Sequence, residues 1–348
     1  MDFALDDDQQ LIVDTVRRFS ERDLRGWAAD ADRAGAPPEK FAHAAGELGL
    51  FLDAVPAEHG GLLEGAYSHT TRALRGYELG RGCAALAALC ECNVETALAV
   101  GAWGDAATKK AVFEALGSGK TAPFVNLRGG GALNSPFTGK LPATPGLATA
   151  SHVLVYLADG KLVLLDATKL RIKPITPSGW RAAQWATAEA EAVPATLLSD
   201  NPAHGAQVLA WARASLAARA VGVSVAAMEY ADAYGKERVQ FGQPIGTFES
   251  LIRLRDDALT TAAAARLLAL HAAWLIDRGA QTANDTASRA RVIAGDCVTR
   301  ATIDAVQIFG GYGFVNDYPV EKLMRDARAF EALHGNERFD RVLAQKVA

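Results

Sequence analysis

The alanine-rich second half of the chain is the feature that most constrains the fold. Two long segments keep their apolar residues at helical spacing, one ending near Gly235 and one running from Glu249 to Gly279, and a third helix is predicted for residues 283–310. The first two segments are apolar on more than one face, and such a helix needs neighbouring helices to cover it. Residues 201–348 are therefore predicted to form a helical bundle that is partly buried against other subunits.

Residues 1–120 are also predicted to be helical. In the stretch DDDQQLIVDTVRRFSERDL, the apolar residues Ile12, Val16 and Phe19 fall on one face of a helix. The acidic residues 6–8 stand just before this face, where carboxylates cap a helix start and suit its dipole. The later segments of this region are rich in alanine and leucine, which favours helix over strand. We therefore predict an N-terminal helical domain.

The pattern changes to strands in residues 121–200. Val153, Val155 and Leu157 alternate with other residues, ADGK supplies a turn, and residues 162–165 return as a second apolar strand. Several prolines punctuate the region, as short strands and loops require. The predicted fold class is therefore mainly α, with a small β domain between two helical domains.

Charge and composition exclude several classes of protein. The formal net charge is −4 and the signs are interspersed, so no basic stripe suits a nucleic acid. The N-terminus is acidic, unlike a signal peptide, and we expect no apolar run long enough to cross a bilayer. Neither the four cysteines nor the histidines have the spacing of a metal site. We expect a soluble, cytoplasmic protein that binds no nucleic acid, membrane or metal.

Three sequence blocks carry a resemblance to a known family. They are ELGLFLDAVPAEHGGL at residues 47–62, ERVQFGQPIGTFES at 237–250 and DAVQIFGGYGFVNDYPVEKLMRDAR at 304–328. In order and spacing they resemble the acyl-CoA dehydrogenase family of flavoproteins over nearly the whole chain. The resemblance implies a shortened middle β-barrel, a C-terminal four-helix bundle and FAD as cofactor. It also implies an acyl thioester, usually of CoA, as substrate for α,β-dehydrogenation, and a homo-oligomer, either a dimer or a tetramer.

The second and third blocks contain the predicted cofactor residues. Arg238 offers a rigid fork of donors to a pyrophosphate, Phe241 offers an aromatic face, and two adjacent glycines allow close backbone approach. Alternatively, Arg238 is a solvated arginine at a helix end and the glycines only end a helix. The resemblance implies FAD contacts from the following set: Arg238, Gln240, Phe241, Gln307, Gly310, Gly311 and Asn336.

The position of the family's usual base is changed. Most members have a glutamate directly before a Gly-Thr pair, and here that tripeptide is HGN, beginning at His334. The other familiar position, just before the matching Arg213, holds Ala212. A neutral imidazole can accept a proton, so His334 is the candidate catalytic base. Two alternatives stay open: His334 is not catalytic, or Glu331 or Glu337 reaches the site instead.

The departures leave the activity open as well. The resemblance implies substrate contacts for Arg213 and Arg325, but the flavin-seating segment of the β domain is reduced to NLRGGGAL at residues 126–133. The first hypothesis is an FAD-dependent acyl-CoA dehydrogenase-like oxidoreductase. The second is a catalytically degenerate subunit that forms a hetero-oligomer with a longer homologue. A third is a flavoprotein with an altered reaction.

Overall fold

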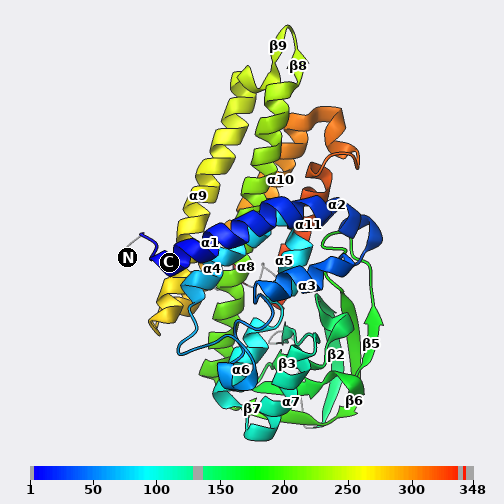
Figure 1. Cartoon of the computed structure of the whole chain (residues 1–348), viewed down its shortest axis with the longest axis vertical. Helices are drawn as coiled ribbons and strands as arrows, with labels where there is room; N and C mark the ends of the chain where they lie inside the picture. The colour runs from blue at the N-terminus through cyan, green and yellow to red at the C-terminus, as the bar shows by residue number, and fades with distance from the viewer. Residues whose placement is uncertain (1–3, 128–135, 336–339, 342–348) are drawn as a thin grey trace.

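The computed structural model describes residues 4–127, 136–335 and 340–341. Helices come first, a region of short strands follows, and long helices end the chain; the strands of residues 124–199 lie toward one end of the molecule and the hairpin of residues 239–244 lies at the other (Figure 1). The predicted fold class is therefore confirmed. Asn336, Glu337 and residues 128–133 of the flavin-seating segment lie outside the described residues.

The helical elements have the bounds that follow. They are α1 Asp7–Phe19, α2 Arg25–Ala34, α3 Glu39–Glu47, α4 His69–Gly82, α5 Ala84–Glu91, α6 Val94–Trp103, α7 Ala106–Gly117, α8 Pro202–Glu237, α9 Glu249–Asp277, α10 Ala283–Phe309 and α11 Val320–Ala332. A π-helical turn, Ser20–Leu24, joins α1 to α2. Short 3₁₀ turns follow α10 and α11, at Gly310–Phe314 and Leu333–Gly335.

The start of α1 shows how local sequence sets a helix boundary. The Asp6 carboxylate accepts a hydrogen bond from the Gln9 backbone nitrogen at 2.7 Å, and the Gln9 side chain accepts one from the Asp6 nitrogen at 3.3 Å. This reciprocal pair is a capping box, which satisfies two backbone donors that the helix leaves unpaired. The predicted acidic cap is confirmed, and Asp6 supplies it.

The strands form two sheets and one small hairpin. Their bounds are β1 Phe124–Asn126, β2 Phe137–Thr144, β3 His152–Tyr156, β4 Leu162–Asp166, β5 Arg171–Pro174, β6 Ala186–Val193, β7 Ala195–Ser199, β8 Val239–Gln240 and β9 Gln243–Pro244. One sheet has the order β1-β3-β4-β7, the other has the order β2-β6-β5, and β8 pairs with β9.

The predicted hairpin of residues 153–165 is confirmed as β3 and β4, which pair antiparallel from His152 opposite Asp166 to Tyr156 opposite Leu162. One face of this sheet, including Leu154, packs on α6 and α7, and the other face packs on the second sheet. Burial on both faces explains why these strands are continuously apolar. This packing places β1 against the turn that follows α11.

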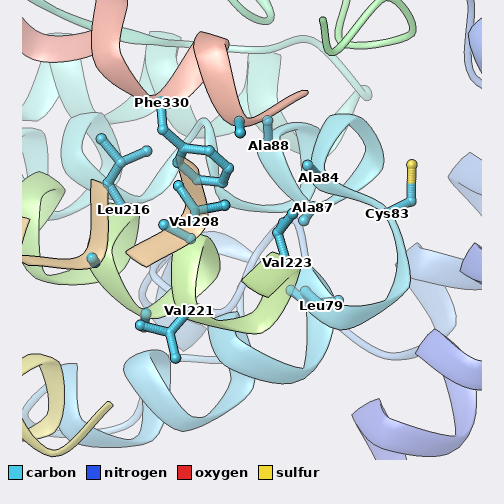
Figure 2. Packing of buried hydrophobic residues seen from close by; sticks show 14 of the residues in the cluster. Leu79, Cys83, Ala84, Ala87, Ala88, Leu216, Val221, Val223, Val298 and Phe330 are labelled. Atoms are coloured by element: carbon cyan, nitrogen blue, oxygen red, sulfur yellow. The ribbon is translucent and has the colours of Figure 1, made fainter. Parts of the chain in front are cut away.

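Helix α8 is the centre of the bundle. It packs against α4, α9, α10 and α11, and Figure 2 shows Leu216 and Val223 of α8 among Val298 of α10 and Phe330 of α11. The crossing with α4 is close because Gly222 has no side chain: a Cβ there would lie 2.1 Å from the backbone oxygen of Tyr77. The small residues of α8 thus set how near the bundle lies to the N-terminal helices.

The prediction that no apolar run is long enough to cross a bilayer is wrong. Three segments are long and apolar enough by length and composition: Ala84–Trp103, α8 and α9. Within the first two, 89% and 94% of the most apolar window is buried inside the chain, so their apolar residues form core. In α9 only 28% of that window is buried. Alanine-rich core helices can have the length and hydropathy of membrane-spanning helices, so these two properties do not tell the two kinds of helix apart.

Candidate functional site

The hairpin after α8 presents the first group of predicted cofactor residues. Arg238 ends the helix, Gln240 is exposed in β8, and Phe241 stands at the tip with φ of 53° and 93% of its surface exposed. The Arg238 guanidinium lies 5.5 Å from the centre of the Tyr312 ring. The structure therefore brings this hairpin to the turn that follows α10, about 70 residues later.

That turn contains the second group of predicted cofactor residues. Gln307, Gly310 and Gly311 are all exposed, and a Cβ built on either glycine would meet no atom within 4 Å. Gly310 has φ of 59°, which disfavours a side chain at that position. The backbone here is open to a close approach by a ligand.

The two groups together fit a dinucleotide diphosphate. Among the residues that the structure describes, no carboxylate pairs with Arg238, so its donors stay available for an anion. Exposed aromatic rings stand beside it at Phe241, Tyr312 and Phe314. A guanidinium fork that no described carboxylate occupies, an open glycine backbone and exposed aromatic faces together suit a dinucleotide such as FAD. Asn336, the remaining predicted contact, lies outside the described residues.

His334 lies elsewhere, in the turn after α11. Its ring stacks on Phe124 of β1 with 5.4 Å between centres, and its backbone oxygen accepts a hydrogen bond from the Asn126 amide at 2.8 Å. Its backbone is left-handed, with φ of 52°, which a residue with a side chain rarely adopts. Since the β8–β9 hairpin lies at the end of the bundle opposite the sheets, one chain does not bring His334 to the predicted cofactor residues (Figure 1).

The surroundings of His334 favour the neutral imidazole. Burial and then the guanidinium groups of Arg291, Arg219, Arg213 and Arg72 hold the pKa of His334 well below its ordinary value. Protonation would add a positive charge to a cluster that is already cationic. At neutral pH the imidazole is therefore uncharged and able to accept a proton. The neighbouring guanidinium groups disfavour the imidazolium that would then form.

Arg213 is buried behind the turn that carries His334. It is 1% exposed, pairs with Asp340, and donates to the Asn284 side chain at 3.1 Å. Asp340 also accepts from Arg291 at 2.7 Å, and Arg291 donates to the backbone oxygen of Leu333. In this chain Arg213 thus helps to anchor the turn, and its predicted substrate contact stays a prediction.

Arg325 has a similar structural role. Its guanidinium donates to Asp32 of α2 at 2.7 Å, to Glu321 one turn earlier at 2.8 Å and to the backbone oxygen of Ser178 at 2.6 Å. These bonds join α11 to α2 and to the loop before β6. All three nitrogens of the group already have acceptors in this chain, and its predicted substrate contact also stays a prediction.

A layer of buried charge between α4 and α5 was missed by the sequence analysis. The Glu91 carboxylate accepts from Arg72 at 2.6 Å and from Arg75 at 2.6 Å. Arg72 also donates to Glu95 at 2.8 Å, and Arg75 to Asp53 at 2.5 Å. Two glutamates one turn apart in an otherwise apolar segment, and two arginines three apart in the preceding helix, were the available signal.

A small cavity separates this charged layer from His334. Its volume is about 30 Å³, and its walls include Glu91, Cys92, Glu95, Trp180, Arg219 and His334. Loss of solvation raises the pKa of the Cys92 thiol to about 12, so the thiol is protonated at neutral pH and is not a nucleophile. A larger cavity of about 400 Å³ lies near α3 and α7, and no predicted site residue lines it.

Sequence comparisons match nearly all of the chain to one family. Residues 6–120 match the family model of the acyl-CoA dehydrogenase N-terminal domain, and residues 205–347 match that of the C-terminal domain. The probable acyl-CoA dehydrogenase YngJ of Bacillus subtilis is 30% identical over 382 residues, which cover 99% of this chain and 98% of that protein. Another B. subtilis acyl-CoA dehydrogenase is 43% identical over 134 residues, or 38% of this chain and 35% of its own length.

Solved structures share the fold. A glutaryl-CoA dehydrogenase in complex with glutaryl-CoA has a TM-score of 0.89 at 24% identity and covers 99% of this chain and 96% of its own. Butyryl-CoA dehydrogenase of Megasphaera elsdenii has a TM-score of 0.85 at 23% identity, with 100% and 99% covered. A Mycobacterium smegmatis glutaryl-CoA dehydrogenase in complex with FADH2 has a TM-score of 0.86 at 16% identity, with 99% and 95% covered.

Proposed function

This chain belongs to the acyl-CoA dehydrogenase family, and we propose that it is an FAD-dependent oxidoreductase that acts on an acyl-CoA or a related thioester by α,β-dehydrogenation. The observation that carries the proposal is the meeting of Arg238 with the glycine turn at Gly310 and Gly311. FAD, when bound, supplies the acceptor for the substrate's β-hydride. The chain's own part is to hold the diphosphate through Arg238 and to offer Phe241 as an aromatic face.

The complete site takes residues from more than one chain. The Arg238 hairpin and the β sheets lie at opposite ends of the bundle (Figure 1), so the hairpin of one subunit would meet the β domain of another. Exposed apolar side chains support such contacts, including Phe241 and Phe314 near the hairpin and Leu267 and Ile303 on α9 and α10. We therefore propose a homo-oligomer, dimer or tetramer, or an assembly with a longer homologue.

His334 is the proposed proton acceptor. It lines the cavity beside β1, and its ordinary form at neutral pH is the unprotonated one. Because guanidinium groups oppose the imidazolium, a negative ligand in the cavity would have to offset their charge during proton transfer. The His334→Ala variant tests this role, and an unchanged rate of substrate oxidation would show that another group takes the proton.

The cofactor assignment is tested by comparing two arginine variants. Arg238→Ala removes the proposed diphosphate donor, whereas Arg253→Ala removes an exposed arginine of α9 as a control. We expect the purified parent and the Arg253 variant to carry flavin visible by absorption, and the Arg238 variant to lose most of it. Anaerobic addition of acyl-CoA thioesters to the parent should then bleach the flavin. Equal flavin content in the two variants would refute the role of Arg238.

The second candidate function is that of a degenerate partner subunit. It is favoured by the size of the cavity beside His334, which at about 30 Å³ holds one or two water molecules and no acyl chain. In this case the chain would complete the cofactor site of a longer, catalytic homologue through its Arg238 hairpin. Flavin that binds only when such a homologue is co-expressed, and then depends on Arg238, would favour this function over the first.

A further inference from the structure

A cavity of about 400 Å³ lies between α3, the end of α7 and the loop that joins α3 to α4. Its volume is within the range of pockets that hold small ligands. Most of its wall is apolar, and the larger apolar side chains in the wall are Phe41, Phe51, Leu52, Leu62, Leu89 and Leu116. Leu62 keeps 62% of its surface exposed although it lines this cavity. A ligand in the cavity would therefore bury apolar surface that the chain leaves open.

The polar side chains of the wall gather on one side of the cavity. Lys120 and Thr121 follow one another after α7. The Asn93 side chain lies beside them, because its Oδ1 accepts a hydrogen bond at 2.9 Å from the backbone nitrogen that follows Thr121. Gln184 joins them through Thr149, whose hydroxyl donates to Gln184 Oε1 at 2.8 Å and lies 3.1 Å from the Thr121 hydroxyl. The cavity thus has one polar side and one apolar side.

The polar side offers hydrogen-bond donors and a positive charge. Asn93 is 3% exposed, and since its oxygen accepts from a backbone N–H, the nitrogen of its amide is the atom left over. That nitrogen has no acceptor among the described residues. Lys120 is exposed and forms no ion pair within the described ranges, and no carboxylate lines the cavity there. A buried donor without an acceptor costs free energy, so this side favours a ligand with an anionic oxygen.

We propose that this cavity is a second ligand site, which binds a monocarboxylic acid with an unbranched apolar chain. The carboxylate accepts from the Asn93 amide nitrogen and pairs with Lys120, while the chain lies against the phenylalanine and leucine side chains of the opposite side. With about 30 Å³ for each group of the size of a water molecule, the cavity has room for about a dozen non-hydrogen atoms. Octanoate and decanoate are acids of this size.

The proposed acid site is separate from the cavity beside His334. Leu89 and Asn93 stand one helical turn apart at the end of α5, so they share a face, and both line the larger cavity. Glu91 and Glu95 share a different face and line the cavity beside His334. The inference therefore goes beyond the proposed function and does not rest on it.

The experiment measures the binding of free acids to the full chain by isothermal titration calorimetry. The series runs from hexanoate to dodecanoate in steps of two carbons, below the concentrations at which the acids form micelles. We expect the affinity to rise about fourfold for each added methylene group up to decanoate and then to level off, because the cavity is full. We also expect octanoate to bind about 10-fold more tightly than 1-octanol, which has the same chain and no charge.

Two variants with matched controls locate the site. Lys120→Ala should weaken the binding of octanoate by about 3- to 10-fold and leave that of 1-octanol unchanged. Lys173→Ala removes an exposed lysine of β5 outside the cavity wall and should change neither. Gly46→Phe puts a ring in the wall, where a Cβ has no neighbour within 4 Å, and should weaken both ligands by at least about 10-fold. Gly26→Phe, which has the same open surroundings on α2, should weaken neither.

Three results would overturn the proposal. The parent chain binds no acid of the series, or it binds 1-octanol as tightly as octanoate, or Lys120→Ala and Gly46→Phe both bind octanoate like the parent. The third result would place the acid elsewhere, the cavity beside His334 included. The first two need no variant, so they decide the question even where a variant fails to fold. Flavin content and thioester oxidation are separate measurements, so a failure of the proposed function leaves this test intact.

Discussion

The close crossing of α4 and α8 can be tested by adding one methyl group at Gly222. The Cβ of Gly222→Ala would lie 2.1 Å from the Tyr77 backbone oxygen and 2.9 Å from the Arg81 nitrogen. Both neighbours are backbone atoms of α4, so a side-chain rotation cannot relieve the contact. The two helices would have to separate by about 1 Å along this direction, which disturbs a close-packed core.

Two effects of opposite sign set the expected change in the free energy of unfolding. Overpacking of this kind costs about 3 kcal/mol, while alanine in place of glycine within a helix contributes about 1 kcal/mol. We therefore expect the free energy of unfolding of Gly222→Ala to be about 2 kcal/mol lower than that of the parent. The same substitution at Gly26, exposed in α2 with no atom near its Cβ, should gain about 0.5–1 kcal/mol.

The assay is urea unfolding followed by tryptophan fluorescence, with both variants and the parent at one protein concentration, because assembly contributes to apparent stability. The two substitutions change the same atoms, so the difference between them, about 3 kcal/mol, reports the helix crossing alone. If the two variants unfold within about 0.5 kcal/mol of each other, the close approach of α4 and α8 is not real and the position assigned to Arg219 loses its support.

Three further predictions concern buried charge, pH and capping. Burial lowers the pKa of His69 to about 3, so between pH 7 and pH 5 the unfolded chain binds a proton that the folded chain refuses. Between pH 7 and pH 5 the free energy of unfolding of the parent should therefore fall by about 2 kcal/mol more than that of His69→Phe, as measured by urea unfolding. Equal decreases in the two chains would contradict the low pKa of His69. Glu91→Gln leaves two buried arginines short of a carboxylate and should cost about 3 kcal/mol, whereas the exposed Glu47→Gln should cost little. Asp6→Ala removes the cap of α1 and should cost about 1 kcal/mol, and a thermal unfolding midpoint that does not change would show that the cap is dispensable.

The long helices and the hairpin were predictable because local signals determine them. The end of α8 was expected near Gly235 and lies at Glu237, and α9 was expected to close at Gly279 and ends at Asp277. Periodic apolar residues bounded by glycine and proline give such limits without knowledge of the tertiary structure. The β3–β4 hairpin follows from alternation and a turn in the same way.

The charged layer was not predictable by the same means. Arg72 and Glu91 are 19 residues apart and meet only because α4 and α5 fold against each other. Periodicity treats each arginine as a solvated residue, since it contains no information on which helices will pack. The same limit applies to Arg325, whose contact with Asp32 joins residues 293 apart. Residue motifs indicated a cofactor, but the electrostatics around His334 depend on contacts that only the fold supplies.

The low pKa of His334 depends in part on the neighbouring guanidinium of Arg219. Burial and then four guanidinium groups hold the pKa of His334 well below its ordinary value, and one of the four, Arg219, forms no ion pair with a described carboxylate. An anion that pairs with Arg219 would remove part of the repulsion felt by the imidazolium, so the pKa of His334 should rise when the anion binds. A titration of the His334 ring by NMR, with and without a saturating acyl-CoA thioester, measures this directly. A pKa of His334 that does not move on binding would mean that no negative group of the bound thioester lies near the imidazole.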